Sequence, residues 1–156
     1  MGGNGVGPIV TVLICIALLT AYWFWDASKF VMGNKLDFSQ SSYLPIYCAV
    51  NPDRAGDIEE SAAAYFWNGN IRIDLKVVNS TQQTLSTIYA HEIVDPSQKA
   101  YLWRDDRPAG TTENNVSDFP ILSGISHAIQ WFCFPWILFD YTKFTTPNGM
   151  QFEPSS

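Results

Sequence analysis

The sequence has few of the residues that build metal centres. It contains two histidines and three cysteines among 156 residues. The histidines, His91 and His127, lie far apart, and neither a Cys-x-x-Cys nor a His-x-x-x-His pair occurs. Structural and catalytic zinc sites normally use such closely spaced pairs. The sequence therefore predicts neither a metal site nor a bound cofactor.

Signatures of nucleophilic catalysis and of phosphate binding are missing as well. Neither Gly-x-Ser-x-Gly nor Ser-x-x-Lys, two motifs that mark serine nucleophiles, occurs in the chain. The glycines of residues 2–7 precede an apolar run instead of following a strand, so they do not resemble a phosphate-binding loop. Ser123, close to His127, fits a capped turn better than a catalytic pair. The acidic pairs at 59–60 and 105–106 are expected in loops or turns, and we expect no enzymatic activity.

Positive charge is scarce. Nine Lys and Arg residues stand against fifteen Asp and Glu residues, which gives a formal net charge of −6. The basic residues form no patch or run, whereas proteins that bind nucleic acid depend on such patches to neutralise phosphates. Nucleic acid is therefore not an expected partner.

One long stretch carries no charge at all. Residues 8–25 are apolar over 18 positions, near the minimum for a helix that crosses about 30 Å of hydrocarbon. Tyr22, Trp23 and Trp25 gather at its C-terminal end, where an interfacial aromatic belt is expected. No basic residue precedes the run and no small-x-small cleavage site follows it, so an uncleaved anchor is favoured over a removed signal peptide. We expect a tail at 1–7, a transmembrane anchor at 8–26, a tether at 27–43 and one domain at 44–156.

The clearest secondary-structure signal is a hairpin at residues 61–78. Residues 70–78 alternate strictly, with Ile71, Ile73, Leu75 and Val77 on one face and Arg72, Asp74 and Lys76 on the other. This period of two predicts a strand with one buried and one solvent-exposed face. Asn68-Gly69 precedes it and suits a two-residue type I′ turn, in which both central residues need a positive φ.

Further short strands are separated by turn residues, which predicts a mainly β domain built as an antiparallel meander. The spacing of βαβ units is absent, so a parallel sheet is not expected. The aromatic stretch at 131–152 is interrupted by Pro135 and Pro147 and is expected to be an extended cover over the sheet. The additional strands are expected at 44–50, 84–94, 99–104 and 109–113.

The order of these motifs resembles a known group of proteins. The relevant residues are Ile71-Arg72-Ile73-Asp74, then Tyr101-x-Trp103, then Cys133-x-x-Trp136 with Asp140-x-x-x-Phe144-x-x-Pro147 and Phe152. The pattern covers residues 48–152 and resembles prokaryotic secreted or membrane-anchored small β-domain proteins of unestablished function. In part it is similar to the lipoprotein-carrier (LolA/LolB-like) superfamily. That resemblance implies a curved antiparallel sheet that closes incompletely as a barrel.

The resemblance also bears on the cysteines. Proteins of this group carry a cysteine pair at the places of Cys48 and Cys133, which favours a disulfide over two buried thiols. Such a bond would tie the first strand to the C-terminal segment, and a small β domain gains stability from a covalent link. Cys15 falls within the apolar run and is expected to be inert.

The disulfide decides the expected orientation. Lys29 and Lys35 follow the apolar run and on their own would place the domain in the cytoplasm. A disulfide instead requires an oxidising space, so we expect a single-pass protein of the cell membrane with an extracytoplasmic domain. Asn79 and Asn115 begin glycosylation sequons and are possible modification sites.

Aromatic residues are numerous for the size of the domain, and two interpretations remain open. They fill the core, or they line an apolar groove inside the curved sheet that takes an acyl chain or an extended peptide. The first favours a non-enzymatic domain that binds an envelope or surface protein, and the second favours a carrier or sensor of a lipid or lipidated peptide. The residues concerned are Tyr65, Trp67, Tyr101, Trp103, Trp131 and Trp136.

Overall fold

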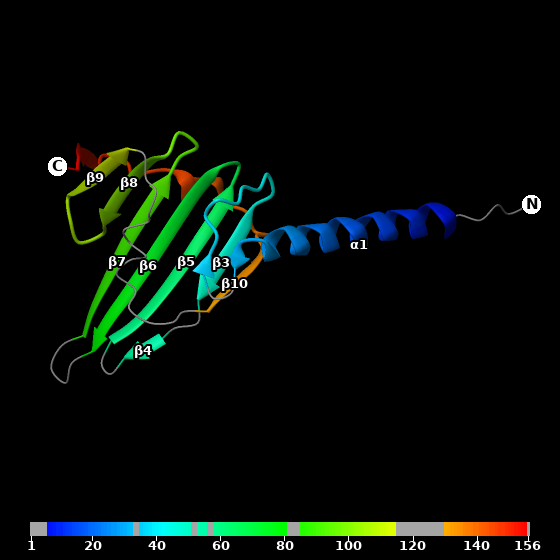
Figure 1. Ribbon diagram of the computed structural model, residues 1–156, viewed down its shortest axis with the longest axis horizontal. Coiled ribbons are helices and arrows are strands. Elements are labelled where there is room, and N and C mark those ends of the chain that lie inside the picture. The colour runs from blue at the N-terminus through cyan, green and yellow to red at the C-terminus, as the bar shows by residue number, and fades with distance from the viewer. Residues whose placement is uncertain are drawn as a thin grey trace, which may run out of the picture.

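The computed structural model describes residues 6–32, 35–50, 53–55, 58–80, 85–114 and 130–155. A long N-terminal helix projects from one side of a broad, open, twisted sheet (Figure 1). The prediction of a mainly β fold with one apolar helix and an open antiparallel sheet is confirmed. The elements are α1 (Val6–Ser28), β1 (Val31–Met32), β2 (Lys35–Leu36), β3 (Ile46–Val50), β4 (Asp53–Ala55), β5 (Ile58–Trp67), β6 (Asn70–Ser80), β7 (Leu85–Val94), β8 (Lys99–Arg104), β9 (Ala109–Asn114), β10 (Trp131–Pro135), the 3-10 helix η1 (Tyr141–Phe144) and β11 (Gln151–Pro154).

Within the described residues, the large sheet has nine strands. Eight run in the order β10-β3-β5-β6-β7-β8-β9-β11, and β4 pairs with β5 outside this path. The strands from β5 to β9 form the expected meander, since each pairs with its neighbour in the chain. The acidic pair Glu59-Glu60 lies within β5 and not in a loop.

The central hairpin has the predicted geometry. β5 and β6 pair over ten residues, from Ile58 opposite Asn79 to Trp67 opposite Asn70. Asn68 and Gly69 have φ values of 49° and 76°, as a two-residue turn with two positive φ angles requires. Local sequence therefore determines both the turn and the register of the longest strands.

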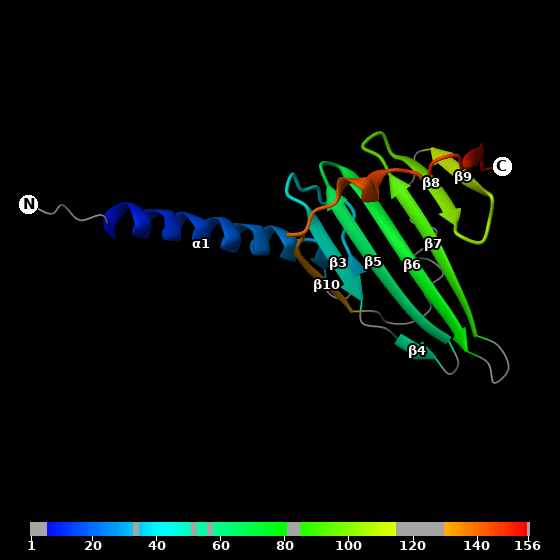
Figure 2. The same cartoon turned by 180° about the vertical axis from the view of Figure 1, so that it is seen from behind.

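The C-terminal segment is part of the sheet as well as its cover. Its two ends form the edge strands β10 and β11, and the chain between them crosses one face of the sheet (Figure 2). β10 pairs antiparallel with β3, whereas β11 pairs parallel with β9. The sheet is thus antiparallel except at this edge, where a chain that first crosses the face returns in the parallel direction without a βαβ crossover.

The two faces of the sheet have different roles. We name the face that carries Ala64, Phe66 and Ile73 the core face, because these side chains are almost fully buried there. Phe30 packs on Phe66 with ring centroids 4.5 Å apart, and Leu36 joins the same cluster. The stretch expected as a tether thus covers part of the core face.

The opposite face, named the site face, carries Tyr65, Arg72 and His91. The expectation that this side of β6 faces solvent holds at Lys76 but is wrong at Arg72, which is only 9% exposed. The reason is that η1 and its flanking residues lie over this end of the strand, as the contact from Arg72 to Lys143 shows.

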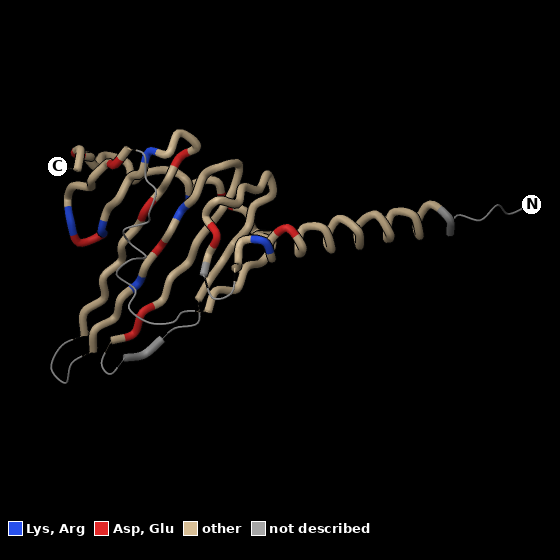
Figure 3. The backbone as a smooth tube through the Cα atoms, viewed as in Figure 1, with Lys and Arg blue, Asp and Glu red and all other residues tan. Residues whose placement is uncertain are grey.

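The helix α1 is long enough to span a bilayer. Its 23 residues extend about 34 Å at 1.5 Å per residue, compared with about 30 Å of hydrocarbon. It stands clear of the sheet for most of its length, and Figure 3 shows no charged residue on it before Asp26. An isolated soluble helix of this composition would leave a large apolar surface in water, which is unfavourable.

The last turns of α1 are built into the domain. The Trp23 indole Nε1 donates to the Pro45 carbonyl at 3.1 Å. The buried Asp26 carboxylate accepts from Ser42 Oγ at 2.6 Å and from Lys29 Nζ at 3.1 Å. Ala27, in the next position, is fully buried. The helix and the sheet are therefore joined by packing and not only by the chain.

A first prediction concerns the parallel edge strand. A Cβ at Gly110 would lie 2.5 Å from a ring carbon of Phe152 and 2.6 Å from the Leu102 carbonyl oxygen. Because that oxygen belongs to the backbone, Gly110→Ala is expected to displace β11 and to lower the free energy of unfolding by about 1–3 kcal/mol. Denaturant titration and hydrogen exchange of the β11 amides measure this. The neighbouring exposed variant Thr111→Ala is the control and should stay within about 0.5 kcal/mol; equal effects of the two variants would contradict the prediction.

Candidate functional site

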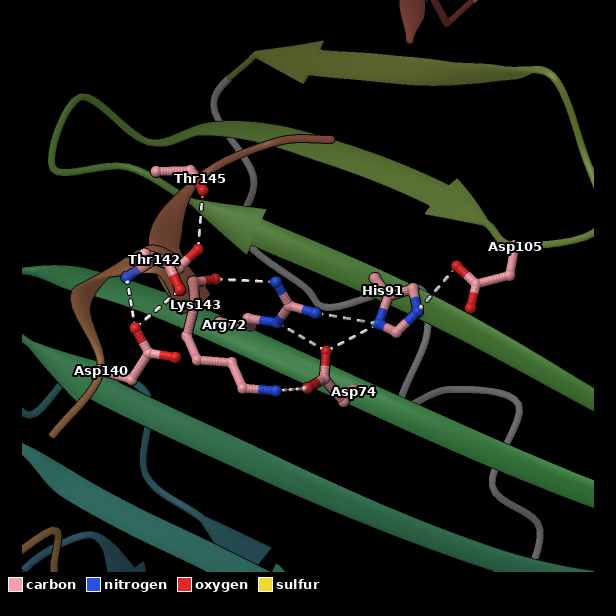
Figure 4. A network of polar contacts seen from close by, with 8 residues as sticks. All are labelled: Arg72, Asp74, His91, Asp105, Asp140, Thr142, Lys143 and Thr145. Atoms are coloured by element: carbon pink, nitrogen blue, oxygen red, sulfur yellow. Dashed lines mark hydrogen bonds and ion pairs between the residues drawn. The ribbon is translucent and has the colours of Figure 1, made fainter. Parts of the chain in front are cut away.

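Three neighbouring strands bring a group of charged side chains together on the site face. Arg72 and Asp74 lie two positions apart on β6, so both point to the same face. The register places His91 of β7 opposite Asp74 and Trp103 of β8 opposite His91. Asp105 follows in the turn after β8, and Lys143 comes from η1 above the sheet (Figure 4). The cluster thus combines the central meander with the C-terminal segment.

Asp74 is the centre of this cluster. Its Oδ1 accepts from Arg72 Nε at 2.6 Å and lies 2.7 Å from His91 Nδ1. Lys143 Nζ lies 3.9 Å from the other carboxylate oxygen. Burial alone would raise the pKa of Asp74, but the hydrogen bonds and charges of His91 and Arg72 together lower it below the ordinary aspartate value. Asp74 is therefore a partly buried anion held by three cationic or hydrogen-donating groups.

His91 connects two carboxylates. Its Nδ1 faces Asp74, and its Nε2 lies 3.2 Å from Asp105 Oδ1. A neutral imidazole donates from one nitrogen only, whereas the protonated ring donates from both. Because Nδ1 donates to Asp74, Arg72 Nη2, which lies 3.2 Å from Nδ1, is a close neighbour of the ring and not a donor to it. The ring also stacks on Trp103 with centroids 5.1 Å apart, which holds its plane.

Arg72 also ties the C-terminal segment to the sheet. Its Nη1 donates to the Lys143 carbonyl oxygen at 2.8 Å, across 71 residues of sequence. The short helix that presents this carbonyl is capped by Asp140, whose Oδ1 accepts from the Thr142 amide at 3.0 Å and from the Thr142 hydroxyl at 2.6 Å. These hydrogen bonds lower the pKa of Asp140, so the cap stays ionised at neutral pH.

An aromatic cluster adjoins the charged group. Trp136 packs against Tyr65 with centroids 4.9 Å apart and against Phe139 at 5.1 Å. Phe139 also packs against Trp67 at 4.7 Å. Burial in this cluster, with the negative charge of Asp74 nearby, raises the pKa of Tyr65 to about 12, so the phenol stays neutral. The cluster fixes the path of the C-terminal segment over β5.

A hollow opens beside the charged group. It has a volume of about 480 Å³ and lies between the β8–β9 turn and the chain after η1. Most of its lining is polar or charged, so it suits a hydrophilic ligand better than an acyl chain. The lining residues are Arg72, His91, Trp103, Asp105, Thr142, Thr145, Thr146, Pro147 and Asn148.

The predicted disulfide is present. Cys48 of β3 and Cys133 of β10 lie opposite each other in register and are bonded. Cys15 is a free, exposed cysteine on α1. Asn79 is exposed near the end of β6, where its modification remains a prediction, and Asn115 lies outside the described residues.

The six predicted aromatic residues do not form one group. Tyr65, Trp67 and Trp136 belong to the cluster on the site face, where each has a ring partner. Tyr101 and Trp103 lie further along the same face against Phe152. Trp131 is buried on the core face with Phe30 and Phe66.

The site offers polar recognition. In the described part of the chain, no group of three or more His, Cys, Asp and Glu side chains is arranged to hold a metal ion. Among those same residues, the polar partners of the His91 ring are two carboxylates and a guanidinium, not a serine or cysteine nucleophile. Ser123 and His127 lie outside the described residues.

Sequence reasoning identified neither the charged cluster nor the role of His91. One local signal was available, since Arg72 and Asp74 share a face of the same strand. The position of His91 opposite Asp74 depends on the exact length of the β6–β7 connection, and the contribution of Lys143 depends on a long-range contact.

Comparison of the chain with family models, with curated proteins and with solved structures finds no match.

Proposed function

We propose that the protein is a single-pass membrane protein whose sheet domain lies outside the cytoplasm and binds an envelope or surface protein without catalysing a reaction. One observation carries this proposal: a solvent-exposed apolar helix of spanning length is packed at its end into a disulfide-bonded sheet. A disulfide is favoured outside the cytoplasm, and an exposed apolar helix is favoured in lipid.

The hollow on the site face is the proposed binding position. Its hydroxyl, amide and carboxylate groups come from Thr145, Asn148 and Asp105, and they suit a polar loop of a partner protein. The residues around it are held by the Arg72 contact and by the Asp140 cap, so the surface is largely formed before binding. A preformed surface costs less conformational entropy on association.

Two features argue against other functions. Both His91 nitrogens face carboxylates, so the ring has no free nitrogen aimed at a substrate in this arrangement. The aromatic side chains of the site face pack on one another and on the C-terminal segment, which leaves a mainly polar hollow. A lipid carrier would instead need a large apolar cavity, so this second candidate has less support.

The proposal is tested by site-specific photocrosslinking in intact cells of the native host. A photoreactive residue at Asn148 is expected to give one stoichiometric adduct with an envelope or surface protein. Filling the hollow by Thr146→Trp should reduce the adduct at least tenfold, equivalent to about 1.4 kcal/mol of binding free energy. The exposed variant Thr87→Trp, on the far end of β7, is the control and should leave the adduct unchanged.

Anchoring is measured separately in the same cells. The chain should remain in the membrane pellet after alkaline carbonate extraction, and a protease added outside should reach the sheet domain. Loss from the pellet would contradict anchoring, and absence of an adduct with the chain still anchored would contradict partner binding. Lipid that co-purifies and is seen by native mass spectrometry would favour the carrier.

A further inference from the structure

A second surface of the domain is apolar and exposed beside the helix exit. Residues 131–139 contain no charged residue. Figure 3 shows charged residues at the end of α1 nearby, where Asp26 and Lys29 form an ion pair with each other. Ile137 and Leu138 are 76% and 87% exposed, and Tyr43 is 88% exposed. We name the exposed apolar side chains around the helix exit the exit patch. It comprises Tyr43, Phe132, Phe134, Ile137 and Leu138.

One backbone oxygen places this patch at the end of the helix. The Pro45 carbonyl accepts from the Trp23 indole at 3.1 Å and also from the Trp136 amide at 2.9 Å. Trp136 directly precedes Ile137 and Leu138, so the exposed pair lies beside the last turns of α1. β10, which carries Phe132 and Phe134, lies next to the same end of the helix in both ribbon views (Figures 1 and 2).

The depth of the end of α1 in a bilayer determines the depth of the exit patch. If α1 spans a bilayer, Tyr22, Trp23 and Trp25 lie in the interfacial belt, where aromatic rings are favoured. In the described part of the stretch between α1 and the sheet, Phe30 and Leu36 are buried in the core cluster and hold the helix end close to the sheet. The exit patch then lies at the same level as the belt.

We propose that the exit patch inserts into the interfacial region of the bilayer and seats the sheet with its β10 edge toward the lipid. This inference rests on the proposed membrane anchoring of α1. The side chains involved are uncharged and the chain carries a net charge of −6, so the contact is apolar and independent of anionic headgroups. The seating leaves the hollow on the site face away from the lipid, because it is lined from β8 and from the chain beyond η1.

The inference is tested on the full chain in phosphatidylcholine nanodiscs. A Cys15→Ser background leaves an introduced cysteine as the free thiol, since Cys48 and Cys133 are bonded. A nitroxide is attached in turn at Ile14→Cys in the helix, Leu138→Cys in the patch and Thr87→Cys at the far end of β7. Its collision rates with oxygen and with a water-soluble nickel chelate are then compared.

The labels at positions 14 and 138 are expected to favour oxygen severalfold over the chelate, and the label at 87 to show the reverse. Raising the salt from 0.1 to 1 M should leave the label at 138 unchanged, because screening acts on charges.

A water-exposed label at 138 with a lipid-exposed label at 14 overturns the seating but not the anchoring. A water-exposed label at 14 overturns both. Spin–spin broadening at 138 with low access to both reagents would show a second copy on the patch and overturn the lipid contact.

A double variant and its control test whether the exit patch inserts into the lipid or only lies close to it. With the nitroxide at Tyr43→Cys, the double change Ile137→Ser and Leu138→Ser should raise chelate access at least twofold, because the patch loses its main apolar groups. Leu85→Ser is the matched control, since Leu85 is 74% exposed at the far end of β7. An unchanged Tyr43→Cys label in the double variant overturns the inference.

Discussion

Replacing Cys48 and Cys133 together by alanine is expected to lower the free energy of unfolding by about 4–5 kcal/mol in the chain-entropy treatment of disulfides. The bond joins residues 85 positions apart, so its loss releases a large loop in the unfolded chain. The same bond links the edge strand β10 to β3, and through β10 it holds the segment that crosses the site face. The measurement is denaturant unfolding of the full chain in detergent micelles, followed by tryptophan fluorescence.

The matched control is Cys15→Ala, since this cysteine is free and exposed on α1. It should leave the unfolding midpoint of the sheet unchanged, because it touches neither face of the sheet. Single domains are stable by about 5–15 kcal/mol, so the double variant is expected to lose a large part of its total stability. A loss below about 1 kcal/mol would mean that strand pairing alone holds the C-terminal segment.

Local rules account for the centre of the sheet. The strict alternation of residues 70–78 and the Asn68-Gly69 pair predict the longest hairpin correctly, because turn geometry and a buried face together fix the register. The length and composition of the apolar run also predict α1 correctly. Like the hairpin, this helix is determined by residues that are close together in the sequence.

Long-range contacts account for what could not be predicted. β10 reads Trp-Phe-Cys-Phe-Pro, with no alternation, so its pairing with β3 leaves no periodic signal. Arg72 looks like a surface residue on its strand, and its burial depends on a segment 71 residues away. Asp105 lies next to His91 because of the conformation of the turn after β8. The conformation of such a turn leaves no periodic pattern in the sequence.

The second large effect is expected at Arg72. Arg72→Met keeps much of the side-chain volume but removes the donors to Asp74 and to the Lys143 carbonyl. Breaking a buried ion pair costs about 3–5 kcal/mol, and we expect a loss of about 3 kcal/mol because Asp74 keeps His91 as a partner. Lys76→Met is the matched control. It removes a positive charge from the same face of β6, but at an exposed position, and should change stability by less than about 0.5 kcal/mol.

The pH dependence distinguishes loss of the ion pair from loss of packing. The folded-state pKa of Asp74 is lowered, so its pairing stabilises the fold above the ordinary aspartate pKa of about 3.9 and ceases to do so as the pH falls through the lower folded value. The difference in unfolding free energy between the native chain and Arg72→Met should therefore shrink between pH 7 and about pH 3. Urea titrations across this range measure it, with hydrogen exchange at η1 reporting release of the C-terminal segment. The Arg72 guanidinium carbon also lies 5.3 Å from the centroid of the Trp103 ring. A difference that stays constant with pH would assign the effect of Arg72 to this ring contact and to the packing of the C-terminal segment, and would remove Asp74 from the centre of the site.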